Sequence, residues 1–182
     1  MHTRRIDVQA FRRSDHLWDI ELHLTDVKPI DCRLESGVRP AGEPIHDMWV
    51  RLTIDDAYTI HTAQAVTDRM PYPGLCQKIT PAYEQLVGLN LRRGFRLRVA
   101  EIFRGVAGCT HLTELLSVVP TAAVQAIFAK PSTADAKPFQ LDRCHALDTR
   151  GEAVARFHPR WHVASAPGGD AAVAANTVNT AK

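Results

Sequence analysis

The stretch "DMWVRLTIDDAYTIHTAQAVTD", Asp47 to Asp68, decides the fold that we expect. From Met48 to Ile54, apolar and more polar side chains alternate, which is the period of a half-buried strand. The triplet "DDA" (Asp55–Ala57) predicts a tight turn, and "YTIHTAQAVTD" returns as a second strand. The stretch therefore predicts an antiparallel β-hairpin.

The same alternation occurs upstream of the hairpin. In "LWDIELHLTD" (Leu17–Asp26), every second residue from Trp18 to Leu24 is apolar, and polar residues stand between them. We therefore predict strands within residues 5–34. The glycines and prolines of "RLESGVRPAGEP" (Arg33–Pro44) predict a loop.

Helical signals dominate the next part of the chain. Thr80 followed by Pro81 is a typical N-cap and first helical residue, which predicts a helix from Pro81 to about Val87, ending at Gly88. A second helix is expected over Phe95–Phe103. The third carries the i, i+3, i+4 stripe of a core-facing helix, with a kink expected at Pro120. The stripe is formed by Leu112, Leu115, Leu116, Val119, Ala123, Ala126 and Ile127.

The C-terminal part predicts a last pair of strands, "KPFQLDRCHAL" and "EAVARFHPRWH", around the turn "DTRG". The fold class that follows is α+β, with one domain over residues 1–163. It has an antiparallel sheet of about five to seven strands and helices near residues 80–88, 93–104 and 109–129 on one face. Residues 164–182 are small and polar without periodicity, so we expect a disordered tail.

Composition limits the partners. A net charge of +2 over 182 residues is too small to indicate a nucleic-acid or membrane partner, so we expect a small-molecule substrate and leave an oligomer open. No apolar run is long enough to span a bilayer, and no secretion signal follows the charged N-terminus. A cytoplasmic location is therefore expected, where the four cysteines stay reduced.

Candidate metal ligands gather at predicted element ends. His46 and Asp47 stand immediately before the first hairpin strand, and Cys76 follows the second. The start of one hairpin strand and the end of its partner meet at the same edge of the sheet, so these residues should lie close together. In "GVAGCTHLTELL" (Gly105–Leu116), Cys109 and His111 stand where the third helix begins.

We therefore expect His46, Asp47, Cys76, Cys109 and His111 to converge, with at least three of them binding zinc or iron. Asp47, Tyr72 and His111 are the catalytic candidates, with Tyr72 between two prolines beside Cys76. Two alternatives stay open for Cys109: a nucleophilic thiolate activated by His111 and the helix dipole, or a small buried thiol. Cys144 and His145 are adjacent in a predicted strand, so at most one can face the site.

The order of these pieces resembles the NifU/IscU type of iron–sulfur scaffold over about Glu43–Phe128. The matching segments are "IHDMWVRLTIDD", "AQAVTDRMPYPGLC", "ITPAYEQLVG" and "GCTHLTELL". The resemblance implies a scaffold-like core with a metal or cluster site. That family has a cysteine where Ile45 and His46 stand, and its last pair reads His–Cys. These two differences from the scaffold family's pattern imply that the site holds a single metal ion.

The whole chain resembles a bacterial family known as domain of unknown function 2889. The segments that carry this resemblance are "GEPIHDMWVRLTID", "GCTHLTELL", "DRCHAL" and "HPRW", within about Arg5–Trp161. The resemblance supplies no activity and implies only an association with aromatic-compound catabolism.

The expected function is a small metal-dependent enzyme, a non-redox lyase or hydrolase of a small metabolite, with lignin-derived aromatics as one candidate class. Two alternatives remain: a non-catalytic metal or iron–sulfur carrier, and a structural zinc protein. The sequence has neither a GxGxxG motif nor a P-loop, so no nucleotide cofactor is expected.

Overall fold

A computed structural model describes residues 1–127 and 136–164 and confirms a mixed α+β architecture. The chain divides into two compact units, Met1–Lys130 and Pro131–Lys182. The sequence predicted a single domain over residues 1–163, with no boundary after Lys130. The expected tail lies outside the described residues from position 165 onward.

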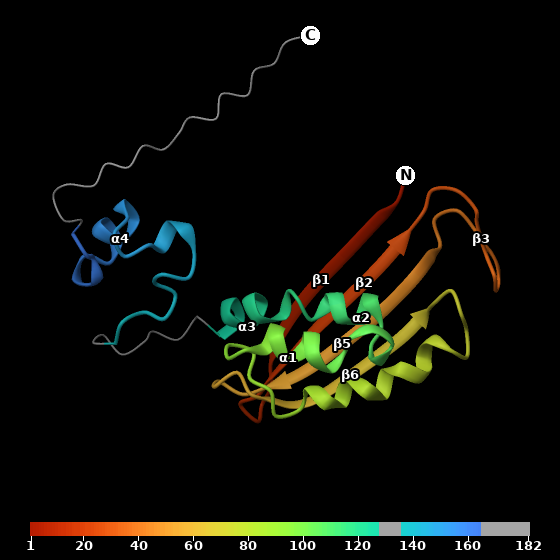
Figure 1. The fold of residues 1–182 in the computed structure, drawn as a ribbon, viewed down its shortest axis with the longest axis horizontal. Helices are drawn as coiled ribbons and strands as arrows, with labels where there is room; N and C mark the ends of the chain where they lie inside the picture. The colour runs from red at the N-terminus through yellow and green to blue at the C-terminus, as the bar shows by residue number, and fades with distance from the viewer. Residues whose placement is uncertain (128–135, 165–182) are drawn as a thin grey trace, which may run out of the picture. The chain divides into compact units, whose positions relative to one another are not determined.

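The first unit contains a four-stranded antiparallel sheet with the strand order β1-β2-β5-β6 (Figure 1). The hairpin predicted from residues 47–68 is confirmed as β5 and β6. The sheet is smaller than the predicted five to seven strands, because residues 138–160 form no strands, and β3 and β4 pair only with each other in a separate hairpin. The strands are β1 (Thr3–Arg12), β2 (Trp18–Val27), β3 (Cys32–Leu34), β4 (Gly37–Arg39), β5 (Pro44–Ile54) and β6 (Ile60–Arg69).

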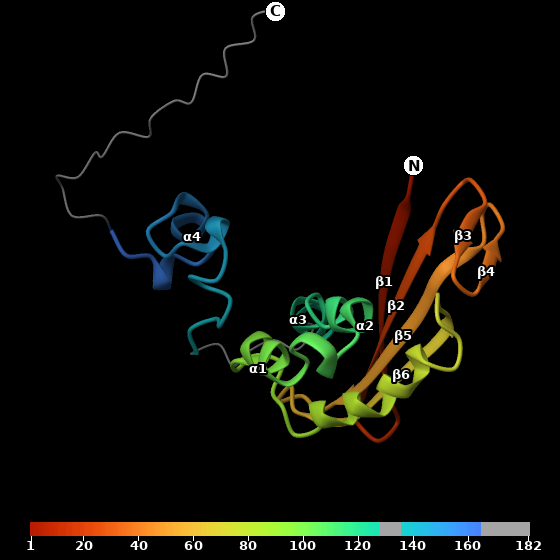
Figure 2. The same ribbon diagram turned by 45° about the vertical axis from the view of Figure 1, so that its right-hand side comes forward.

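The helices of the first unit cover one face of this sheet (Figures 1 and 2). The predicted helix at 109–129 is two helices, and Pro120 stands in the first turn of the second one, where proline removes no hydrogen bond. The predicted helix at Pro81 is a 3₁₀ helix that begins earlier. The helices are η1 (Cys76–Leu86), α1 (Phe95–Ile102), η2 (Gly105–Ala107), α2 (Thr110–Leu115) and α3 (Val119–Ile127).

The core lies between the sheet and α2–α3. The alternating apolar residues of β2 and β5 face the helices and are almost completely buried, and so is the stripe of α2 and α3. Full burial of each large side chain contributes about 1.5–3 kcal/mol, so this contact fixes α2 against the sheet. The residues are Ile20, Leu22, Leu24, Met48, Val50, Leu52, Leu112, Leu115, Leu116, Val119, Ala123 and Ile127.

The second unit contains η3 (His145–Leu147), α4 (Glu152–Phe157) and η4 (Pro159–Trp161). The predicted hairpin over residues 138–160 is wrong. Asp142 adopts a positive φ of 61°, and its carboxylate accepts hydrogen bonds from the N–H and hydroxyl of Thr149. The chain therefore closes a compact loop there. Helix formers follow in "EAVARF", with Glu152 at the positive end of the helix dipole.

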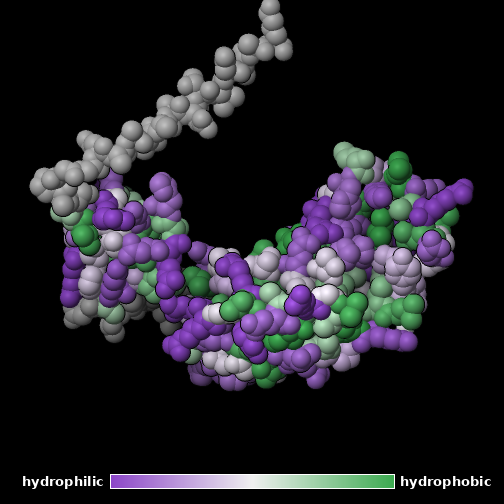
Figure 3. Space-filling view, in the orientation of Figure 1, coloured by the Kyte–Doolittle hydropathy of each residue, from purple (hydrophilic) through white to green (hydrophobic). Residues whose placement is uncertain are grey.

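The surface of the first unit mixes hydrophilic and hydrophobic residues (Figure 3). Large exposed apolar side chains come from separate elements, for example Leu75, Leu97 and Val106. Single exposed apolar residues of this kind are normal on protein surfaces.

Candidate metal centre

Three neighbouring strands place polar residues at one end of the core face. Antiparallel register sets Arg4 of β1 opposite Asp26 of β2, and Asp26 opposite His46 of β5. Directly opposite residues point to the same face of a sheet. All three therefore continue the inward-facing apolar rows of their strands, and they meet beneath α2.

The Asp26 carboxylate is the centre of this group, with its side chain only 3% exposed. Arg4 donates from Nε to Oδ1 (2.8 Å) and from Nη2 to Oδ2 (2.7 Å), and His2 Nε2 lies 2.9 Å from Oδ1. Burial alone would raise the pKa of Asp26, but the hydrogen bonds and charge of Arg4 outweigh it and hold the pKa at about 2. Asp26 is therefore an anion at neutral pH.

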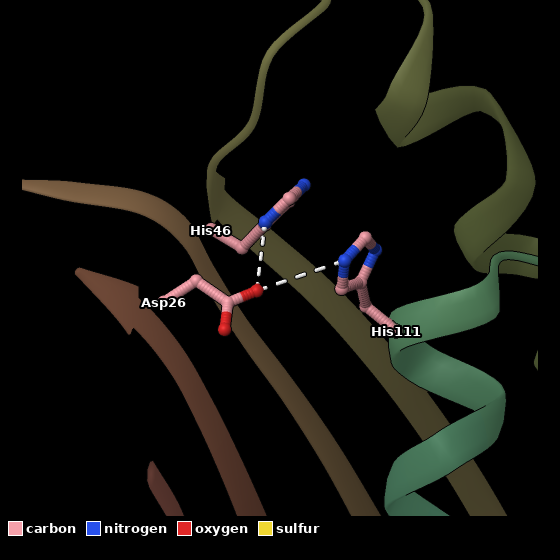
Figure 4. A group of neighbouring side chains, drawn as sticks. All are labelled: Asp26, His46 and His111. Atoms are coloured by element: carbon pink, nitrogen blue, oxygen red, sulfur yellow. Dashed lines mark hydrogen bonds and ion pairs between the residues drawn. The ribbon is translucent and has the colours of Figure 1, made fainter. Parts of the chain in front are cut away.

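Two histidines complete the group (Figure 4). His46 Nδ1 lies 3.0 Å from Asp26 Oδ2, and His111 Nε2 lies 3.6 Å from the same oxygen. The two imidazole rings stack with their centroids 3.7 Å apart. Burial lowers the pKa of both histidines, and the charge of Arg4 lowers both pKa values further; protonation of His111 would also disfavour protonation of His46. The neutral form of each ring is therefore favoured at pH 7.

The position of His111 depends on the turn before α2. Tyr83 of η1 is fully buried, and its hydroxyl accepts a hydrogen bond from the N–H of Cys109 (3.0 Å) and shares one with the Thr113 hydroxyl (2.8 Å). Tyr83 thereby holds the first turn of α2, which carries His111. One turn further, Glu114 forms an ion pair with Arg4, which joins α2 to β1.

These groups fit a divalent metal ion. Asp26, His46 and His111 each offer a ligand atom within 4.8 Å of the other two, and among the described residues no other such set of three His, Cys, Asp or Glu occurs. Neighbouring ligands of a tetrahedral zinc site lie about 3.4 Å apart, and the two distances to Asp26 Oδ2 bracket this value. Arg4 orients the carboxylate from the outer shell, as partners of metal ligands commonly do.

The structure brings two of the five predicted ligands together, His46 and His111. Asp47 lies on the opposite face of the sheet, where its Oδ1 is 2.7 Å from His23 Nε2 and His23 stacks on Trp49. The reason is that β5 begins at Pro44, four residues before the predicted strand. Neighbours within a strand point to opposite faces, so His46 and Asp47 are separated by the sheet.

The predicted thiols and phenol do not join this group in the described part of the chain. Cys76 begins η1 and Cys109 is the N-cap of α2, and both are half-buried against the core. Tyr72 is half exposed in the loop after β6, at the same end of the sheet as His46. Cys144 is exposed and His145 begins η3, both in the second unit.

Asp26 and Arg4 were missed by the sequence analysis, although a signal exists for both. Asp26 occupies the next inward position after Leu24, and Arg4 the inward position before Ile6. A charged residue in an otherwise apolar row needs a partner when it is buried. Such a residue near the end of several strands indicates a polar site under the helices.

One known family covers the part of the chain that forms this group. The family model described as "Protein of unknown function (DUF2889)" matches residues 2–125. The chain belongs to this family. The match includes Asp26, His46 and His111 and ends before "DRCHAL" and "HPRW", which also carried the resemblance.

No curated protein and no solved structure matches the chain, so the likeness to NifU/IscU scaffolds rests on residue pattern alone. Within the described residues, every helix is too short or too polar to cross a membrane.

Proposed function

We propose that the protein is a small metal-dependent enzyme in which Asp26, His46 and His111 bind a zinc or iron(II) ion. The observation that carries the proposal is the approach of His46 Nδ1 and His111 Nε2 to one oxygen of Asp26, at 3.0 and 3.6 Å. Metal ligands must be deprotonated. The low pKa of Asp26 and the lowered pKa values of both histidines meet this requirement at neutral pH.

A set of three protein ligands favours an enzyme over a structural site. Structural zinc sites use four protein ligands, whereas catalytic sites use three and keep a position for substrate. The side chains of His46 and His111 are 14% and 24% exposed, so both are in contact with solvent. An ion bound there supplies Lewis acidity, which suits a lyase or hydrolase.

The remaining groups of the site orient the ligands and move protons. Arg4 holds Asp26 in place and keeps it ionised through its two hydrogen bonds. Glu114 lies one helical turn from His111 with a partly exposed carboxylate, where it can accept a proton from a small substrate. We extend the proposal to a small aromatic substrate, which the family resemblance suggests.

A second candidate is a metal-free acid–base enzyme. The Asp26–His46 hydrogen bond resembles a carboxylate–histidine pair that orients an imidazole, with Nε2 of His46 left to exchange a proton with substrate. Activity that survives complete metal removal would favour this candidate. The iron–sulfur carrier is less well supported, since Cys76 and Cys109 do not join the group among the described residues, and visible cluster absorption would be needed to revive it.

The chain offers a matched control for the metal test. The outer face carries a second His–Asp pair, His23 with Asp47, at a similar distance, and no third ligand residue completes it in the described part of the chain. We expect purified protein to contain close to one equivalent of metal by elemental analysis. His46→Asn and His111→Asn should each reduce metal content about tenfold or more, whereas His23→Asn and Asp47→Asn should not.

Substrate turnover is tested separately. Metal-replete protein is incubated with a panel of lignin-derived aromatics and thioesters, and products are followed by mass. Turnover that is lost in His111→Asn and kept in His23→Asn supports the proposal. If wild type binds no metal, or if the outer-face variants lose it and the inner-face variants keep it, the assignment of this site is wrong.

A further inference from the structure

Strand β1 forms an open edge of the main sheet. In the described part of the chain it pairs only with β2, over all ten residues and without a register shift. The opposite edge strand, β6, is packed against η1 (Figure 2). An extended edge strand presents a row of backbone N–H and C=O groups that can pair with another strand.

The side chains of β1 allow only certain pairings with a second β1. Ile6 and Val8 are half-buried on the core face, and Arg5 and Asp7 are exposed on the outer face. In an antiparallel pair about a twofold axis perpendicular to the sheet, opposite residues share a face. Two opposite residues must therefore both have even numbers or both have odd numbers.

Charge selects one of these registers. With Ile6 opposite Ile6 of the second copy, Arg5 faces Asp7 of that copy and Asp7 faces its Arg5, which gives two complementary pairs. With Asp7 opposite Asp7, the two carboxylates repel each other. With Val8 opposite Val8, Arg4 faces Arg12. Like charges directly opposite are unfavourable, so of these three registers the Ile6 register is the self-complementary one.

We propose that two copies of the chain associate through β1 in this register, forming one continuous eight-stranded sheet. Strands β5 and β6 stay away from this contact, because they lie beyond β2 in the strand order. Helix α3, which packs on β1, lies on the same face of the joined sheet in both copies. Backbone pairing over residues 3–9 and the two Arg–Asp pairs define the interface.

The test uses charge reversal in the full-length protein, with mass measured by sedimentation equilibrium. Wild type should have twice the chain mass in the micromolar range. Arg5→Asp and Asp7→Arg should each weaken association about tenfold, because each sets like charges opposite each other twice. The double variant Arg5→Asp/Asp7→Arg should restore it.

Mixing the two single variants gives a second measurement. Positions 5 and 7 are both acidic in Arg5→Asp and both basic in Asp7→Arg, so each facing pair in a mixed dimer joins opposite charges. The mixture should therefore form heterodimers although each variant alone associates weakly. Asp68→Arg, an equivalent reversal on the exposed face of β6, is the control and should leave the mass unchanged. Circular dichroism confirms that each variant is folded.

Two outcomes would overturn the proposal. One is a wild-type protein that stays monomeric at the highest concentration measured. The other is a dimer that the single reversals do not weaken, or that neither the double variant nor the mixture restores.

Discussion

At the scale of single residues, Asp26 and Arg4 act as one unit. Asp26 is a buried anion, and Arg4 supplies two of its hydrogen bonds and most of the compensating charge. Removing one partner of such a pair leaves the other poorly solvated, which costs more than the pair gains in the intact protein. The chemistry of His46 and His111 depends on this pair, because both approach Asp26.

Replacing Arg4 with glutamine should therefore lower the free energy of unfolding by about 1–3 kcal/mol, since Asp26 loses charged hydrogen bonds but Arg4 itself is 30% exposed. The pKa of Asp26 should rise in this variant. Urea denaturation measures the change. Arg33→Gln, at an exposed position of β3, should change stability by less than about 0.5 kcal/mol. Equal effects at both positions would show that the Arg4–Asp26 pair adds nothing.

Stability should also depend on pH through the two histidines. Their folded-state pKa values lie below the unfolded value of 6.5, so their neutral forms favour the folded state above pH 6.5, and this contribution is lost as the pH falls through the folded values. Asp26 remains ionised over that range, because its contribution is lost only between pH 3.8 and about 2. Arg4 and Glu114 are the other charged groups that act on His111.

Urea denaturation of metal-free protein between pH 7.5 and 4.5 measures this dependence. The double variant His46→Asn/His111→Asn should show a shallower loss of stability than wild type as the pH falls. His16→Asn, at an exposed position, serves as the control. A double variant with the same slope as wild type would contradict the expected coupling.

At the scale of elements, the turn between α1 and α2 sets the position of His111. Gly108 lies in this turn, and a Cβ built on it would come within 2.6 Å of Phe103 Cβ and 2.8 Å of the Phe103 carbonyl oxygen. Neither atom is the end of a flexible side chain. Phe103 in turn stacks on Tyr83, which holds the start of α2. The small size of Gly108 is therefore needed for the approach of α2 to the sheet.

Gly108→Ala should destabilise the protein by about 1–3 kcal/mol, the usual cost of overpacking, and reduce metal content because His111 shifts. Thermal unfolding and elemental analysis measure both effects. In Gly151→Ala the closest atom to the new Cβ is 3.2 Å away, so this control should cost less and keep the metal. Unchanged metal content in Gly108→Ala would show that the turn does not position His111.

At the scale of the whole molecule, the main core and the candidate site belong to the first unit. Every residue of the hydrophobic core cluster lies between Ile20 and Ile127, and the family match covers residues 2–125. Asp26, His46 and His111 come from elements of the same unit. In the second unit, Leu141, Thr149 and Val154 are buried.

A fragment of residues 1–130 should therefore fold cooperatively and bind metal with the same stoichiometry as the full chain. Circular dichroism during thermal unfolding and elemental analysis provide the two readouts. The same fragment with His111→Asn is the control and should fold without binding metal. A fragment that fails to fold would show that the second unit contributes to the stability of the first.

The sequence alone determined the features that depend on local pattern. Alternation in β2 and β5 predicted strands, the Asp55–Ala57 turn predicted β6 as the return strand of a hairpin, and the stripe from Leu112 to Ile127 predicted a helix over the sheet. These features follow from the spacing of apolar residues, because each face must be buried as a whole. The hairpin predicted for residues 138–160 failed because a hydrogen-bonded loop at Asp142 and a local helix replaced strand pairing.

Only the tertiary structure decided which polar residues meet. Strand order places β2 between β1 and β5, so that Arg4, Asp26 and His46 come together from positions far apart in the chain. Strand alternation also sends Asp47 to the face opposite its neighbour His46. Both placements depend on where β5 begins and on which strand lies beside it. Residue spacing shows only which residues of one strand share a face, and does not show which residues of other strands they meet.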